Sequence, residues 1–228
     1  MGPTLPDGST SSWLLAPWRQ GRWSRAESPR PVQARRDKRL TGPPDVGGPA
    51  THGPDFATFL HDRGHHVTVV TMADGIPAVR PVPVTAISRS RPFVIRYPAV
   101  ALAGARLARS ADVVYATATY AAAAVASTAA RTPLVVKLVS DPAYERARRY
   151  GVFSGSLESF QHADGARTDG LKRLRTAALR KARRIVVPSA YLAEIARGWG
   201  LEEARLEVLV NPAPPPQHVE AASLAPGT

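Results

Sequence analysis

The sequence predicts an α/β fold in which a doubly wound parallel sheet carries helices on both faces. Short runs of Val, Ile and Leu alternate along the chain with longer Ala-rich segments that have the composition of helices. The short runs are apolar throughout, as is typical of parallel strands that are buried on both faces. A chain of 228 residues is also long enough to form one such domain around its own hydrophobic core.

Five apolar runs are predicted strands. The first, 66–71, is rich in β-branched residues and ends at the turn Ala73-Asp74-Gly75. The others consist mainly of Val, Ile and Leu and lie at 112–117, 134–140, 184–189 and 206–210. A helical segment lies between successive strands, and several crossovers of this kind indicate a Rossmann-like domain.

Five segments are predicted helices, at 55–63, 99–109, 120–130, 169–183 and 190–199. In the fourth, Leu171 and Leu174 belong to one inward-facing stripe with helical spacing. Ser189 is the predicted N-cap of the fifth. The longest uncharged stretch, 113–130, is interpreted as a strand followed by a buried helix rather than as a membrane span.

Residues 1–40 are predicted to form a disordered Arg- and Pro-rich arm outside the domain. This arm holds eight cations and three acids, hence +5 of the chain's net charge of +12. Trp13, Trp18 and Trp23 recur every five residues, a period that fits neither a helix nor a strand. The arm contains no apolar run as long as a signal peptide needs. An alternative interpretation is that its Arg and Trp side chains bind nucleic acid or a membrane.

The domain itself is predicted to span residues 41–212, with a Pro-rich hinge remnant at 213–228. A strong apolar strand should precede the Gly-rich turn at 45–49, but residues 34–41 contain four cations and one acid. Burying even one unpaired charge costs several kcal/mol, so this segment is unsuited to a strand that is buried on both faces. We therefore predict that the first strand is degraded and that residues 1–40 are not native sequence of this fold.

The composition excludes several kinds of chemistry. The chain has no cysteine, which excludes a disulfide scaffold, a Cys-ligated metal and a thiol nucleophile. It contains no GxxxxGK[ST] loop, GxGxxG turn, GxSxG elbow, HExxH motif or Asp-x-Asp pair. The six histidines lack metal-ligand spacing, and the adjacent His65 and His66 face opposite ways on a strand. We expect no metal and no cofactor.

The remaining candidates lie in loops that follow predicted strands, where doubly wound sheets hold their ligands. Gly47 and Gly48 open into a helix, so that their N–H groups can approach a phosphate; the alternative is an ordinary turn. Asp141 follows a predicted strand, where it can act as a base or simply cap the next helix. Glu145 and Arg146 come directly after it.

Five segments in sequence order resemble the N-terminal half of GT-B glycosyltransferases, and are more closely similar to the retaining, family-4-like (group 1) branch. They are 43–52, 62–71, 111–116, 185–192 and 206–212, within a match that runs from Thr41 to Pro212. In that family the N-terminal domain holds the acceptor, while a second Rossmann-like domain binds the nucleotide-sugar donor.

The resemblance implies roles for individual residues. Gly47 and Gly48 match the loop beside the donor diphosphate, and Asn211 matches the turn that closes the domain at the hinge. Asp141 lies where the family places polar residues that reach the transferred sugar, so it is the predicted catalytic residue, with Glu145 and Arg146 as binding residues. Many members carry a His where this chain has Val139, which argues against a His-centred site. Lys137, in the middle of a strand, is predicted to have an internal partner.

The resemblance further implies transfer of a hexose from a nucleotide-sugar to a cell-envelope glycan or lipid, without a metal. The family's two donor-domain Glu residues and its Arg/Lys pair have no match in this sequence, so we expect a truncated chain that is inactive alone. One alternative is a non-catalytic truncated or partner-binding Rossmann module. Another is a nucleic-acid binder, supported only by the positive charge and the arm; we do not expect nucleic acid as a partner.

The segment from Lys172 to Arg184 contains seven cations. Its outer face is either a solvated helix surface or a contact with an anionic lipid leaflet, because acceptors in the family are often lipid-linked. We therefore expect a cytoplasmic protein with possible peripheral contact with the inner membrane face.

Overall fold

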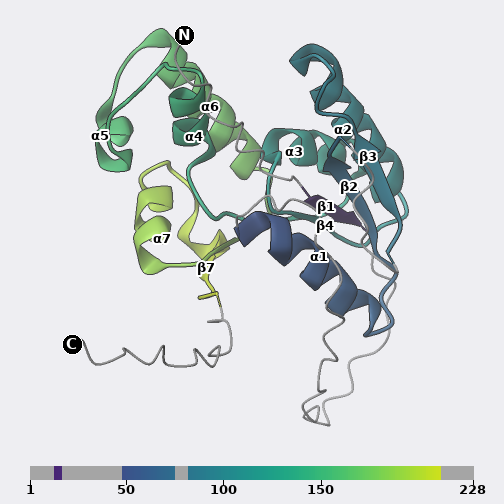
Figure 1. Cartoon of the computed structure of the whole chain (residues 1–228). Coiled ribbons are helices and arrows are strands. Elements are labelled where there is room, and N and C mark those ends of the chain that lie inside the picture. Colours follow the sequence, from purple (N-terminus) through teal and green to yellow (C-terminus); the bar gives the residue numbers. More distant parts are fainter. Residues whose placement is uncertain (1–12, 17–47, 75–81, 212–228) are drawn as a thin grey trace, which may run out of the picture.

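The computed structural model describes residues 13–16, 48–74 and 82–211, which form an α/β fold around one sheet (Figure 1). Among these residues the sheet has seven strands in the spatial order β3-β2-β1-β4-β5-β6-β7. The strands are β1 (Trp13–Ala16), β2 (Thr68–Met72), β3 (Val84–Ile87), β4 (Val114–Ala116), β5 (Leu134–Lys137), β6 (Arg184–Val187) and β7 (Leu206–Val208). All neighbours pair in parallel except β1, which is antiparallel to β2 and β4. The predicted doubly wound sheet is confirmed, with β1 as its exception.

Strand β1 corrects the predicted organisation of the arm. The prediction treated residues 1–40 as disordered, yet Trp13–Ala16 forms an interior strand of the sheet, between β2 and β4. These four residues form an uncharged apolar run, which suits a position with a strand on either side, whereas 34–41 is charged. The remainder of the arm and the predicted hinge remnant at 213–228 lie outside the described residues.

Seven α-helices and one short 3₁₀ helix belong to the described residues. They are α1 (Gly48–His61), α2 (Phe93–Ala108), α3 (Tyr120–Ala130), α4 (Pro142–Arg149), α5 (Leu157–His162), α6 (Ala166–Leu179), α7 (Ala190–Arg197) and η1 (Glu203–Arg205). The five predicted helices are confirmed with shifted ends, and Ser189 caps α7 by accepting the Leu192 N–H. None of these helices is both long and apolar enough to span a bilayer.

Besides β1 and the short η1, β3, α4 and α5 were absent from the predicted elements, although a helix after Asp141 was implied by the capping alternative. Strand β3 and helix α5 have only four and six residues, too few to show a clear hydrophobic period. Helix α4 buries only Ala143 and Ala147, and its remaining side chains are mostly charged. Such short or polar segments resemble loops in composition, which is why the sequence did not reveal them.

The sheet is covered on both faces. Val70 and Met72 of β2 pack into the larger core with α2 and α3, whereas Val69 of the same strand packs with Ala57 of α1. This alternation is the period of a strand, and it confirms that helices lie on opposite faces. Helices α2 and α3 pack against each other through small residues, with α3 built largely from buried alanines. Their close packing fixes the loop that enters α3.

Candidate functional site

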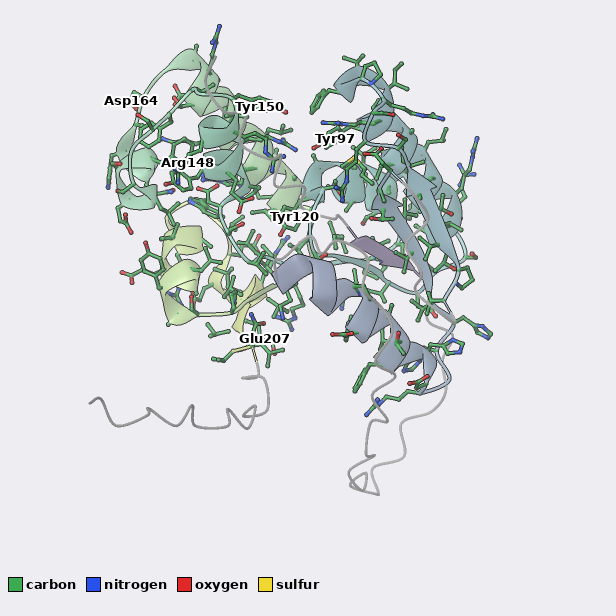
Figure 2. All side chains as sticks on the ribbon, in the orientation of Figure 1. Tyr97, Tyr120, Arg148, Tyr150, Asp164 and Glu207 are labelled. Atoms are coloured by element: carbon green, nitrogen blue, oxygen red, sulfur yellow. The ribbon has the colours of Figure 1, made fainter. Side chains whose placement is uncertain are left out.

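A pocket opens at the carboxyl ends of β4 and β5, between α2, α3, α4 and α6. In Figure 2, Tyr120 lies between the part of the fold that carries Tyr97 and the part that carries Arg148 and Tyr150. Along the sheet the strand numbers fall from β3 to β1 and then rise from β4 onward, so the switch point lies between β1 and β4. The pocket lies next to this point, at the ends of β4 and β5. Doubly wound sheets bind their ligands at this position, and the predicted location of the site agrees with the pocket.

The loop from β4 into α3 forms one wall of the pocket and has an unusual backbone. Thr119 has a φ of 48°, in the left-handed region that a β-branched residue rarely adopts. The Tyr120 hydroxyl lies 2.9 Å from the carbonyl oxygen of Thr117 and 3.0 Å from that of Lys137, and so ties this loop to β5. Burial raises the pKa of Tyr120, with a smaller contribution from the charge of Glu145, so its hydroxyl remains a donor.

Asp141 is buried behind the pocket, with 1% of its surface exposed. Its Oδ1 accepts the N–H groups of Ala143 at 2.8 Å and Tyr144 at 3.3 Å, and thereby caps α4. Its Oδ2 accepts from Arg175 Nη1 at 2.7 Å and Gln161 Nε2 at 3.1 Å. The capping alternative is therefore present in the structure, and neither carboxylate oxygen is exposed to a substrate. The catalytic role of Asp141 stays a prediction, and this geometry does not favour it.

Glu145 and Arg146, on the first two turns of α4, do line the pocket. The Glu145 side chain is exposed. Arg146 Nη2 donates to the Tyr97 hydroxyl at 3.2 Å, and its guanidinium carbon lies 5.4 Å from the centre of the Tyr97 ring. The structure thus brings a carboxylate, a guanidinium and an aromatic ring together at one opening.

The glycine loop is only partly described. Gly48 is the first residue of α1, and Gly47 lies outside the described residues. The helix predicted to follow the two glycines is therefore present. Their predicted role beside a diphosphate stays a prediction.

Asn211 is hydrogen-bonded to a residue of β5. Its Oδ1 accepts a 2.7 Å hydrogen bond from Nζ of Lys137, so the internal partner predicted for that lysine is confirmed. Lys137 is 6% exposed, and burial lowers the pKa of its ammonium group. Asn211 is thus joined to β5, and its predicted place at the hinge and its role in binding stay predictions.

Replacing Lys137 by Met is expected to flatten the rise of stability with alkaline pH. The folded-state pKa of Lys137 lies below its ordinary value of 10.5, so between these two values the unfolded chain binds more protons than the folded chain. Stability therefore rises with pH through this window, and the Met variant lacks that contribution. Thermal melts from about pH 7 to 10.5 measure the slope. Lys181→Met, at an exposed position, is the control and should keep the rise of stability with pH that the parent shows. An equal slope in both variants would contradict the lowered pKa of Lys137.

The cationic helix differs from its prediction in one respect. Two of its seven cations are not exposed: Lys172 donates to the carbonyl oxygens of Gln161 and Ala163, and Arg175 pairs with Asp141. Arg180 and Arg184 also donate to backbone carbonyl oxygens, those of Gly200 and Ala204, but their side chains stay exposed. The five exposed cations are Arg173, Arg180, Lys181, Arg183 and Arg184. The outward charge is therefore smaller than the sequence count, because two long side chains reach back across α5 and α4.

Sequence reasoning missed Tyr97, Thr117, Thr119 and Arg175, which all line the pocket. Thr117 ends a predicted strand and Thr119 follows it, so the rule that selected Asp141 could also have selected them. Tyr97 and Arg175 arrive from helices distant in sequence and carried no local signal. Within the described ranges no group of three His, Cys, Asp or Glu side chains could hold a metal ion.

Comparison with known proteins gives one family. The model of Glycosyltransferase Family 4 matches residues 46–215. None of the curated proteins matches the sequence. The matched segment contains every described element except β1, and it includes all the residues that line the pocket. The α/β fold with its largely parallel sheet agrees with the resemblance drawn from the sequence. The chain belongs to glycosyltransferase family 4.

Proposed function

We propose that this domain is the acceptor-side half of a glycosyltransferase that moves a hexose from a nucleotide-sugar to a cell-envelope glycan or lipid. The acceptor lies in the pocket at the ends of β4 and β5. A second, donor-binding domain completes the active site, and this polypeptide does not turn over without it. The reaction uses neither a metal nor a cofactor, and nucleic acid is not a partner.

The observation that carries this proposal is the position of the pocket. It lies at the carboxyl ends of β4 and β5, next to the switch point of the sheet, and presents Glu145, Arg146 and Tyr97 at one opening. A sugar acceptor needs groups that orient its hydroxyls and a ring surface on which it can rest, and these three side chains supply both. Glu145, as the exposed carboxylate of the pocket, is better placed than Asp141 to accept a hydroxyl proton or hydrogen bond.

The location proposed for the protein is the cytoplasm, with peripheral contact at the inner membrane face. The exposed cations of α6 and of the residues that follow it, Arg173 to Arg184, support an electrostatic contact with anionic lipid. No observation favours the alternative of a non-catalytic partner-binding module over the enzyme.

The proposal is tested by joining residues 1–211 to the donor-binding domain of a family-4 glycosyltransferase. Transfer of labelled hexose to an extract of bacterial lipids and glycans is then measured with UDP- and GDP-sugars. Glu145→Gln is expected to lower transfer at least about tenfold, as for loss of a positioned acid–base or orienting group. Glu207→Gln, at an exposed position on β7, is the matched control and should transfer like the parent. Equal activity of the two variants would leave the pocket without a role in transfer.

A further inference from the structure

The N-terminal end of α3 opens into the pocket. Tyr120 and Ala121, the first two residues of this eleven-residue helix, both line it. The first N–H groups of a helix have no partner within the helix, and the side chain of the N-cap residue, Thr119, accepts none of them. There is also no acidic residue in the first turn of α3. This end of the helix therefore presents unpaired donors and a partial positive charge.

A second, independent feature of the same wall is the hydroxyl of Thr117. Thr117 lines the pocket with 2% of its surface exposed, and its Oγ1 has no hydrogen-bond partner among the described residues. A buried hydroxyl that has lost water without gaining a partner is costly to a fold. It is the kind of group that a ligand satisfies.

The charge of the opposite wall completes the site. Arg146 and Arg149 of α4 both line the pocket, and Glu145 is the one acidic side chain among its described lining residues. In the part of the chain that the structure describes, no carboxylate lies within ion-pair distance of Arg146, whose hydrogen-bond partner is the neutral Tyr97 hydroxyl. The third arginine, Arg175, is paired with Asp141. Arg146 is therefore a cation of this opening that has no carboxylate partner among the described residues.

We propose that this end of the pocket binds an oxyanion, a phosphate or carboxylate group, between the first turn of α3, Thr117 and Arg146. The inference rests on the proposed function and deepens it, because it assigns the acceptor to the class of anionic glycans or phospholipids. The same chemistry could come from the diphosphate of a donor, so the test has to separate the two sources. The carboxylate of Glu145, next to Arg146 in the pocket lining, repels negative charge. The site therefore favours a ligand with a single anionic group over one with several.

The experiment titrates the ¹⁵N-labelled 228-residue chain with inorganic phosphate, with neutral glucose and with UDP. Phosphate is expected to shift the Tyr120 and Ala121 amides in a saturable way, with a dissociation constant in the millimolar range, about −4 kcal/mol. Glucose at the same concentrations should leave these two amides unshifted. If UDP shifts them at concentrations at least tenfold lower than phosphate, the oxyanion belongs to the donor and the assignment to the acceptor is overturned.

Two variants and one control separate a binding site from a structural role. Thr117→Val keeps the shape of the side chain and removes the unpartnered hydroxyl, and Arg146→Gln removes the charge. Each should weaken phosphate binding at least fivefold, while the melting temperature of Thr117→Val stays level or rises. Arg148→Gln, on the same helix but over the Tyr144 ring, should bind like the parent. Equal binding by all three variants, or no saturable shift in the parent, overturns the proposal.

This titration involves no glycosyl transfer, so its failure is distinct from that of the proposed function. Phosphate binding without transfer in the two-domain fusion would retain the oxyanion site and reject the enzyme. Transfer without phosphate binding would retain the enzyme and reject an anionic acceptor.

Discussion

Replacing Asp141 by Ala is expected to destabilise the domain by about 3–5 kcal/mol, the cost of leaving one partner of a buried ion pair without the other. Both side chains are nearly inaccessible, with 0% of the Asp141 side chain and 5% of the Arg175 side chain exposed. Loss of the α4 cap adds about 1 kcal/mol. A domain of this size has about 5–15 kcal/mol of stability in all, so the variant is expected to be close to unfolding.

Urea unfolding followed by circular dichroism measures this difference. Asp164→Ala, an exposed aspartate on the loop before α6 (Figure 2), is the matched control and should change the free energy of unfolding by less than about 0.5 kcal/mol. The double variant Asp141→Asn with Arg175→Met keeps a cap acceptor and removes both charges, so it should recover most of the loss. If Asp141→Ala has the same free energy of unfolding as the parent, the buried pair does not stabilise the fold. The catalytic interpretation of Asp141 would then be favoured over the capping one.

The strands of the parallel sheet were predictable because each one is buried on both faces and must therefore be apolar along its length. Helix α3 was predictable for a related reason: its alanines pack against α2, and an uncharged helix of small residues has no other stable position. In these elements the apolar composition follows directly from the burial, so the composition alone predicts the element.

Strand β1 could not be placed from the sequence in the same way. A doubly wound domain leads one to expect a parallel strand directly before the Gly-rich turn at 45–49. The run that fills the position is Trp13–Ala16, which is antiparallel and ends 29 positions before Asp45 (45 − 16). Four apolar residues within an Arg- and Pro-rich segment carry no period long enough to mark a strand. The pairing partners, and not the run itself, determine its position.

The catalytic and capping interpretations of Asp141 could not be separated from the sequence, because the residue that decides between them is distant along the chain. Its ion-pair partner, Arg175, lies 34 residues later on a helix whose cations were all expected to face outward. The position of Thr117 and Thr119 at the end of a predicted strand could have marked them as candidates. What distinguishes them in the structure is the backbone angle of Thr119 and the unpartnered hydroxyl of Thr117, which composition does not encode.

The polypeptide of these 228 residues is expected to bind nucleotide-sugars no more tightly than about millimolar and to release no nucleotide from them. A glycosyl diphosphate leaves only when its developing charge is neutralised, and preorganised groups of this kind usually supply the largest catalytic contribution. The family resemblance places those groups in a donor-binding domain. The pocket offers Arg146 and one helix end, but it is open to water, where such contacts contribute little.

Calorimetric titration with UDP- and GDP-sugars, together with an assay of nucleotide release, measures both parts of this prediction. A millimolar dissociation constant corresponds to about −4 kcal/mol, the range in which one weak oxyanion contact can account for all the binding. In that case Arg146→Gln should weaken the nucleotide-sugar as much as it weakens inorganic phosphate. Micromolar binding, or release above the buffer blank, would require a donor site within this domain. The electrostatics of such a site would have to come largely from Arg146 and the first turn of α3, and the division of labour between two domains would fail.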